Sequence, residues 1–261
     1  MNKKHTRTKF EGVRRFVRYN WPFYVMGLLC GIAGILLLRC FSFPSPLPIL
    51  IGVGTGLAWF WLLASVLAAY WVYDASGLYG WEWLQEIFPQ SPKSWANIHA
   101  GLDESSLRLG EIFPDSRFQV LQIHWQNLPV EASLVRAKKE KILSIPPIPA
   151  AFDELPLAEA EMEAVFVIFS AHEIRGLQER IRFLKELGRI LSPSGKIIVV
   201  EHLRDWKNFI AFGPGLGHFY SLKNWRFVFE NAGLKIFREI SWTPFVKIFL
   251  LQKTIPAERI D

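Results

Sequence analysis

The sequence has little cysteine and no cluster of metal ligands. Cys30 and Cys40 lie in or beside one apolar segment, and ten helical residues would separate them by about 15 Å, too far for a disulfide. The six histidines are scattered, with no His/Cys pair at the spacing of a metal site. A Gly-x-Gly-x-x-Gly turn that opens a helix is also missing, which argues against a nicotinamide-dependent reductase. We therefore expect neither a disulfide nor a bound metal.

Charge is absent from two long apolar stretches, residues 21–38 and 48–73. A helix needs about 20 apolar residues to cross a bilayer core, and both stretches approach or exceed that length. Trp21, Trp71 and Tyr73 at their edges are typical of interfacial aromatic belts. A pair of buried core helices is the alternative. A cleaved signal peptide is disfavoured, because the second apolar stretch follows almost at once without a cleavage pattern. We predict a hairpin of two transmembrane helices.

Positive charge is concentrated before Trp21, where seven basic residues face one acidic residue. The rest of the chain is balanced, so the sequence pI of about 9.3 describes a basic tail over residues 1–20 and not a nucleic-acid-binding face. Basic residues beside a span mark its cytoplasmic side, and the short loop between the spans holds only Arg39. We therefore predict an integral protein of a bacterial inner membrane or its equivalent, which contacts the lipid bilayer and no nucleic acid. Its N-terminus and its C-terminal domain would both be cytoplasmic.

An aromatic-rich amphipathic linker over 74–94 leads to a segment in which buried strands and amphipathic helices alternate. This alternation predicts a mostly parallel sheet with helices on both faces, hence an α/β domain over 95–253 with a short tail at 254–261. The last two strands are joined too closely for a parallel crossover and predict an antiparallel edge hairpin. The expected strands lie at 118–125, 163–174, 196–203, 235–242 and 245–253. Helices are expected at 104–113, 130–143, 177–191 and 222–234, a turn at 192–195, and a proline-rich connector with room for a short strand at 145–162.

Three stretches carry a family resemblance: "DELPLAEAEMEAVFVIFSAHEI", "FLKELGRILSPSGKIIVVEHL" and "WRFVFENAGLKI". Together they resemble the C-terminal half of class I S-adenosylmethionine-dependent methyltransferases, in the type 11-like branch that acts on small molecules and lipids. Ser194 stands where that branch usually has the first of two glycines. The resemblance implies a Rossmann-like methyltransferase sheet and S-adenosylmethionine as the cofactor.

The same resemblance places "SWANIHAGLDESS" on the strand, turn and helix that meet the amino-acid end of the cofactor. A glycine there lets the backbone approach the ligand, but this stretch has only Gly101. A helix cap without a ligand is the alternative. The candidate cofactor residues at this turn are His99, Gly101, Asp103 and Ser105, with Asp103 or Glu104 as a partner for the cofactor's ammonium group.

The other cofactor candidates also depart from the family pattern. The family usually has an acid after its second strand for the ribose hydroxyls, and here Gln122, His124 and Trp125 follow or end that strand. Gln122 or His124 could make one such hydrogen bond, and Trp125 could stack on adenine. Asp153 or Glu154 could bind the adenine amino group. Ser170, in the fourth strand, completes the candidate set.

The candidate catalytic residues lie at the ends of two neighbouring strands, at the edge where an open α/β sheet forms its ligand crevice. His172 and Glu173 end one strand, and Glu201 and His202 end the next. A His–Glu pair could take a proton from a methyl acceptor, whereas a polar pair that caps a helix after the strand is the alternative. The glycine-rich stretch 213–218 and its aromatic neighbours predict a lid over an apolar acceptor, or a loop that packs on the core.

These features predict a membrane-anchored S-adenosylmethionine-dependent methyltransferase. Its acceptor would be a hydrophobic or lipid-soluble small molecule collected near the bilayer. The alternative is a catalytically inactive methyltransferase-like protein that binds or scaffolds at the membrane, since the glycine turn and the ribose acid are altered.

Overall fold

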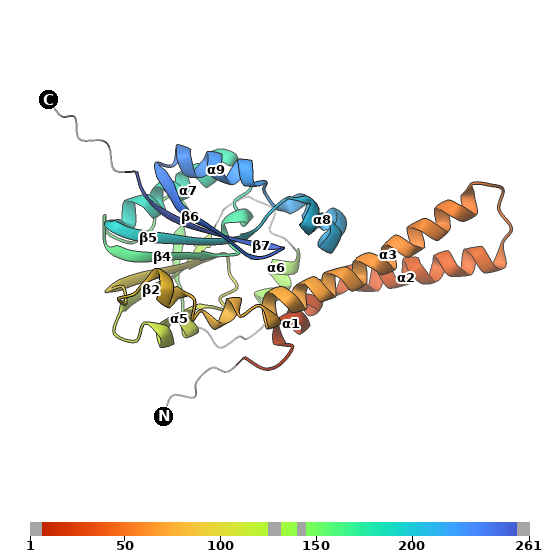
Figure 1. The fold of residues 1–261 in the computed structure, drawn as a ribbon, viewed down its shortest axis with the longest axis horizontal. Coiled ribbons are helices and arrows are strands. Elements are labelled where there is room, and N and C mark those ends of the chain that lie inside the picture. Colours follow the sequence, from red (N-terminus) through yellow and green to blue (C-terminus); the bar gives the residue numbers. More distant parts are fainter. Residues whose placement is uncertain (1–6, 125–131, 140–144, 255–261) are drawn as a thin grey trace.

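The computed structural model describes residues 7–124, 132–139 and 145–254, which form an α/β domain with a long helical arm (Figure 1). Trp125 and most of the expected C-terminal tail lie outside the described residues. The domain has a seven-stranded sheet in the order β3-β2-β1-β4-β5-β7-β6. All neighbouring strands run parallel except β7, which pairs antiparallel with β5 and β6. The predicted Rossmann-like methyltransferase sheet with its antiparallel edge hairpin is therefore confirmed. The strands are β1 Ser94–His99, β2 Arg117–His124, β3 Ile148–Ala151, β4 Met162–Ile168, β5 Leu191–His202, β6 Leu234–Thr243 and β7 Val246–Lys253.

Both faces of the sheet are covered because successive strand residues point to opposite sides. Ile197 and Val199 of β5 belong to one core, whereas Ile198 and Val200 belong to the other. Helices α7 (Leu177–Ile190) and α9 (Leu222–Asn231) bury their apolar stripes in the first core. Helix α5 (Ser106–Ile112) packs against the second core, and the short helix α6 covers Ala132–Ala137. The strands consequently read as continuous apolar runs.

The segment 74–94 is part of the core as well as a linker. A π-helical turn at Trp71–Ala75 leads into it, and it contains a 3-10 turn at Leu78–Gly80 and helix α4 at Leu84–Ile87. Leu78, Trp81 and Leu84 are fully buried against the second face of the sheet. The aromatic content of this segment therefore fills the core that α5 alone would leave open.

Helices α2 (Trp21–Cys40) and α3 (Leu47–Tyr70) form the arm that extends away from the sheet (Figure 1). Both are long and apolar enough to cross a membrane, and only 11% and 6% of their most apolar windows are buried. The alternative of two buried core helices is therefore wrong. The helices pack on each other at glycines, because a Cβ at Gly31 or Gly34 would come within 2.5 or 2.0 Å of Trp59 or Thr55.

Helix α1 (Glu11–Tyr19) lies inside the segment that the sequence analysis treated only as a basic tail. The Asp74 carboxylate accepts hydrogen bonds at 2.8 Å from the backbone N–H groups of Gly12 and Val13, in the first turn of α1. A Cβ at Gly12 would lie 2.4 Å from the Cβ of Tyr73, so glycine permits this close packing. Helix α1 is thus fixed to the junction between the arm and the sheet.

Two local expectations differ from the structure. β4 ends at Ile168, and His172 and Glu173 lie in a 3-10 turn over Ala171–Glu173. Residues 192–195 are not a separate turn, because β5 already begins at Leu191 and its pairing with β4 shifts register between Met162 and Ala164. The irregular pairing absorbs the residues that the sequence analysis assigned to a turn.

Replacement of Asp74 by alanine should release the first turn of α1. A lost helix cap costs roughly 0.5–2 kcal/mol, so the amides of Gly12 and Val13 should exchange hydrogen faster while the sheet stays protected. Hydrogen-exchange mass spectrometry of the full chain measures this, with Asp115→Ala, an exposed carboxylate, as the matched control. Unchanged exchange over 8–20 would show that Asp74 does not hold the helix.

Candidate functional site

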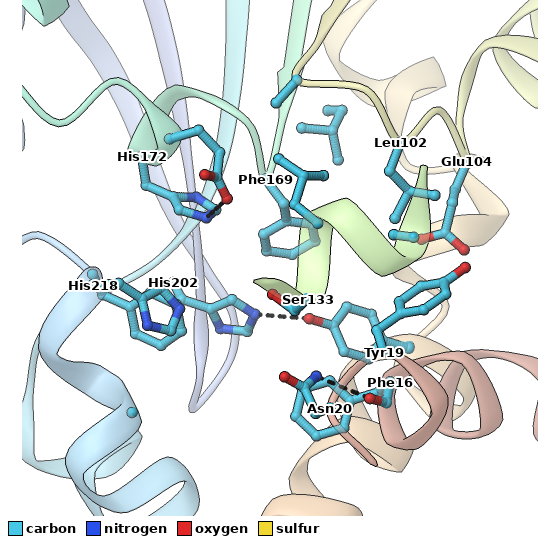
Figure 2. A pocket seen from close by; sticks show the side chains of 18 of the residues that line it. Phe16, Tyr19, Asn20, Leu102, Glu104, Ser133, Phe169, His172, His202 and His218 are labelled. Atoms are coloured by element: carbon cyan, nitrogen blue, oxygen red, sulfur yellow. Dashed lines mark hydrogen bonds and ion pairs between the residues drawn. The ribbon is translucent and has the colours of Figure 1, made fainter. Parts of the chain in front are cut away.

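A cavity of about 320 Å³ lies where the carboxyl ends of β1, β4 and β5 meet helix α1 and the base of the arm. His172, His202 and His218 lie on one side of it, and Leu102, Glu104, Phe16 and Asn20 on the other (Figure 2). Phe23 and Tyr24 of α2 and Ser65 of α3 also line it. The cavity therefore joins the carboxyl edge of the sheet to the apolar arm, and its volume suits a small-molecule site.

The turn after β1 holds a buried polar network. Asp103 Oδ1 accepts hydrogen bonds from the N–H groups of Ser105 and Ser106 at 3.1 and 3.0 Å. The Asn97 amide nitrogen donates to Asp103 Oδ1 and to both serine hydroxyls. Asp103 Oδ2 and Asn97 Oδ1 are buried without a partner among the described residues. Such unsatisfied oxygens cost free energy unless a ligand donates to them.

His99, at the end of β1, presents a donor at the same turn. The backbone N–H of Gly101 donates to His99 Nδ1 at 3.0 Å, so in the neutral ring the proton is on Nε2. Burial lowers the pKa of His99 and keeps the ring neutral. Its Nε2 is buried and has no partner within the described part of the chain. Gly101 adopts φ +121°, a backbone conformation that favours glycine, and the Lys138 side chain lies directly beside it.

His172 lies between two carboxylates. Its Nδ1 is 2.6 Å from Glu201 Oε2, its backbone N–H donates to Glu201 Oε1 at 3.1 Å, and its Nε2 is 3.3 Å from Glu173 Oε1. Burial alone would lower the pKa of His172, but Glu201 and Glu173 outweigh it and hold that pKa well above its ordinary value. Burial acts on Glu173 in the opposite sense, and contact with His172 leaves its pKa below the ordinary value. We name these residues the His172 cluster: His172, Glu173 and Glu201.

His202 and His218 are neutral. His202 Nδ1 faces the carbonyl oxygen of Phe245 at 2.9 Å and must donate to it, so Nε2 accepts from the Tyr73 hydroxyl at 3.1 Å. Burial lowers the pKa of His202 to about 3 and that of His218 to about 4. The ring of His202 also stacks between Phe169 and Phe219. Its contacts make it part of the cavity wall.

Glu104 connects the cavity to helix α1. Its Oε1 is 2.6 Å from Arg15 Nη1 and 3.4 Å from Arg7 Nη2, and Tyr79 donates to its Oε2 at 3.4 Å. The Arg7 guanidinium also lies 4.0 Å above the Tyr79 ring. Glu104 is therefore neutralised by α1, which leaves Asp103 as the carboxylate with a free oxygen at this turn.

The structure brings together most of the residues expected at the site and separates four of them. His99, Ser105, His172, Glu173 and His202 line the cavity. Asp103, Gly101 and Glu201 lie directly behind that lining. Gln122, Asp153, Glu154 and Ser170 do not line the cavity.

Each separated residue has a structural explanation. Asp153 pairs with Arg182 of α7 at 2.9 Å, and Glu154 is exposed. Ser170 donates to the carbonyl oxygen of Ile98 and ties β4 to β1. Gln122 is half-buried on β2 beside His99. Trp125 lies outside the described residues.

Several residues of the site were not predicted from the sequence. Asn97 lies within strand β1, and Lys138 directly follows helix α6, far from the glycine turn in sequence. Phe16 and Tyr19 lie in the basic segment, for which no helix was predicted. Gly12, Phe16 and Tyr19 nevertheless recur at the i, i+4, i+7 spacing of one helix face. His218 ends the stretch expected as a lid, and its 3-10 turn, Gly213–His218, does line the cavity.

Replacement of Glu201 by glutamine should lower the pKa of His172. A folded pKa above about 6.5 means that the charge on His172 stabilises the fold fully below that pH, and the contribution is lost as pH rises through the folded pKa. The loss of stability in Glu201→Gln, roughly 3–5 kcal/mol for a broken buried pair, should therefore shrink at alkaline pH.

Carbon-13 histidine spectra recorded against pH, with His172→Asn for assignment, measure the pKa directly. Glu173→Gln, which removes the longer contact, should shift it less. A His172 resonance that titrates at the same pH in Glu201→Gln and in the unmodified chain would contradict this electrostatic account.

Comparisons with known proteins agree with this geometry. A family described as a methyltransferase domain matches residues 111–199. Human N-acetylserotonin methyltransferase in complex with S-adenosylmethionine superposes with a TM-score of 0.52 at 14% identity, over 94% of this chain and 70% of that chain. The pyocyanin biosynthetic protein PhzM gives 0.50 at 13% identity, over 78% and 66%. A SAM-dependent methyltransferase from Aquifex aeolicus gives 0.47 at 17%, over 64% and 86%. No curated protein sequence matches the chain.

The structural similarities establish the fold, and the domain match covers residues 111–199, about a third of the chain. Strand order 3-2-1-4-5-7-6, with the antiparallel β7, is observed directly. The described residues therefore have the class I methyltransferase fold, and the domain match supports a methyltransferase that uses S-adenosylmethionine as its cofactor.

Proposed function

We propose that the protein is anchored in a membrane by α2 and α3 and methylates a hydrophobic small molecule that reaches the cavity from the bilayer. The observation that carries this proposal is the extent of one cavity. It is lined by the β1 turn, by the His172 cluster and by Phe23, Tyr24 and Ser65 of the arm. Cofactor, proton-transfer groups and an apolar entrance would thus share one space.

The β1 turn fits the amino-acid end of S-adenosylmethionine. Asp103 Oδ2 and Asn97 Oδ1 are buried acceptors without partners in the described chain, and they suit an ammonium group. His99 Nε2 is a buried donor at the same place. We assign Asn97, His99, Asp103 and Ser105 to the cofactor.

The Lys138 side chain could compensate for a cofactor turn that has only one glycine. The Gly101 N–H already donates to His99, so this turn has one backbone donor fewer for a ligand carboxylate. The Lys138 side chain reaches the same turn and brings a positive charge there. We infer that Lys138 binds the cofactor's carboxylate where other family members rely on a glycine-rich loop.

The His172 cluster would receive the acceptor's proton. When bound, S-adenosylmethionine supplies an electrophilic methyl group, so the chain must align the acceptor, exclude water and take up a proton. With one proton on His172 and two carboxylates, the cluster carries a net charge of −1 in a buried site. Glu173 faces the cavity, and its contact with the charged His172 keeps its carboxylate ionised and able to accept the proton that the acceptor releases. Glu201 positions His172 from behind.

The acceptor end of the cavity is apolar and aromatic. Phe16, Tyr19 and Phe23 face it from α1 and α2, while Phe169, Phe212 and Phe219 face it from the sheet domain. These surfaces favour an acceptor with an apolar body. A single hydroxyl, thiol or amine on that body would reach the His172 cluster.

The exposure of the arm supports membrane anchoring. Met26, Leu29, Ile49 and Leu63 are each at least 60% exposed, and such a surface is stable in lipid but not in water. Helix α1 contacts both the arm and the domain, so the basic N-terminal segment and the site lie on the same side. The positive-inside preference makes that side cytoplasmic.

Asp103→Asn should weaken S-adenosylmethionine binding. The substitution keeps the size of the side chain but removes the charge opposite the ammonium group, and a hydrogen bond to a charged group is worth about 1.5–3 kcal/mol, or roughly 10–100-fold in affinity. Calorimetry on the full chain in detergent measures the affinity. Glu104→Gln, whose carboxylate is held by Arg15, should change it far less, and equal losses in both variants would refute the assignment to Asp103.

The full chain, reconstituted with S-adenosylmethionine labelled in its methyl group and a membrane lipid extract, should produce label in an organic-soluble product. Glu173→Gln should lower the rate by about 10²–10⁴-fold without weakening cofactor binding, because it removes the proton acceptor. The surface variant Glu239→Gln should match the unmodified chain. Cofactor binding without any organic-soluble label would instead support the inactive binding or scaffold protein.

A further inference from the structure

Helix α8 (Trp206–Phe212) carries an exposed apolar face beside the arm. Trp206, Phe209 and Ile210 are 68%, 45% and 46% exposed, and their i, i+3, i+4 spacing puts them on one side of the helix. The opposite side buries Asn208 and Ala211 against the domain. The helix is capped by Asp205, whose Oδ1 accepts from the Asn208 N–H at 2.9 Å, so this short helix is well defined at its start.

Contacts with α3 determine the depth of α8 relative to the arm. The Phe209 ring meets the Trp61 ring edge-on at a centroid distance of 5.7 Å, and a Cβ at Gly213 would lie 2.9 Å from the same indole. Trp61 is about 21 Å along α3 from Leu47 at 1.5 Å per residue. We place the turn between α2 and α3 at the far boundary of an apolar bilayer core about 30 Å thick. Trp61 then lies about 21 Å from the far boundary and roughly 9 Å inside the near boundary.

This depth matches that of a helix lying in a membrane interface, whose apolar face enters about 5–10 Å. Arg204 and Lys207, both exposed, flank the apolar face and suit anionic headgroups. We propose that α8 is an interfacial membrane helix, a second lipid contact that lays the catalytic domain against the bilayer. The proposal rests on the membrane anchoring proposed above for α2 and α3.

The position of α8 ties lipid contact to the site. Its last residue, Phe212, lines the cavity and lies 5.5 Å from the ring of His202. The chain then continues through Gly213–His218, whose last residue faces His172 at a ring distance of 6.0 Å. Lipid contact at α8 would therefore place the acceptor end of the cavity at headgroup depth.

Depth-dependent quenching in vesicles tests the proposal. In a chain with Cys30→Ser and Cys40→Ser, single cysteines at Trp206→Cys or Ile210→Cys are labelled with a nitrobenzoxadiazole fluorophore. The protein is reconstituted in vesicles of phosphatidylethanolamine and phosphatidylglycerol with or without spin-labelled lipid. Phe227→Cys, an exposed aromatic position on α9, is the matched control. Native Cys30, kept in a Cys40→Ser chain, reports the arm itself.

We expect blue-shifted emission and strong lipid quenching at 206, 210 and Cys30, and neither effect at 227. Quenching at Cys30 without quenching at 206 and 210 would overturn the role of α8 and leave the anchor intact. No quenching at any position would overturn both proposals. Oxidative cross-linking of Trp206→Cys into dimers, without lipid quenching, would place a second copy on this face and would also overturn the proposal.

Discussion

The site depends on two carboxylates that hold helix α1 against the carboxyl edge of the sheet. Asp74 accepts two backbone hydrogen bonds from the first turn of α1, and Glu104 pairs with Arg15 one turn later. Each carboxylate is charged, and hydrogen bonds to a charged group are about twice as strong as neutral ones. Together with the ring contacts of Phe16 to Tyr73 and Phe212, these two carboxylates hold Phe16 and Tyr19 at the cavity. Without α1 the cavity would be an open crevice of the kind expected at any parallel sheet edge.

The buried electrostatics of the cavity follow from what each histidine faces. His172 meets two carboxylates and carries a charge, whereas His202 meets a carbonyl oxygen and a hydroxyl and stays neutral. His202 is therefore held in one tautomer as part of an aromatic wall. We propose the His172 cluster as the proton acceptor, because Glu173 lines the cavity and the other cavity carboxylate, Glu104, is paired with Arg15. Of these two neighbouring histidines, one is charged and the other neutral, because their hydrogen-bond partners differ.

Much of the fold could be predicted from the sequence, because buried parallel strands and amphipathic helices leave strong periodic patterns. The joint position of His172 and Glu201 was predictable for a similar reason, since β4 and β5 are neighbours and residues at their ends must meet. Helix α1 was not predicted, because seven basic residues obscured its apolar face. Asp153 was misplaced, since its partner Arg182 comes from a helix whose docking no local pattern reveals. The role proposed for Lys138 rests on its tertiary proximity to Gly101, which no local sequence motif reveals.

One cavity connects the turn after β1 to the apolar arm, and we propose that it holds the cofactor at one end and opens to the membrane at the other. A structure of the full chain in a lipid nanodisc with S-adenosylhomocysteine would test this proposal. We expect the amino-acid end of the nucleoside at Asp103 and Lys138, and lipid or acceptor density between Tyr24 and His172. A nucleoside bound elsewhere, or side chains of the arm filling the space before His172, would contradict it.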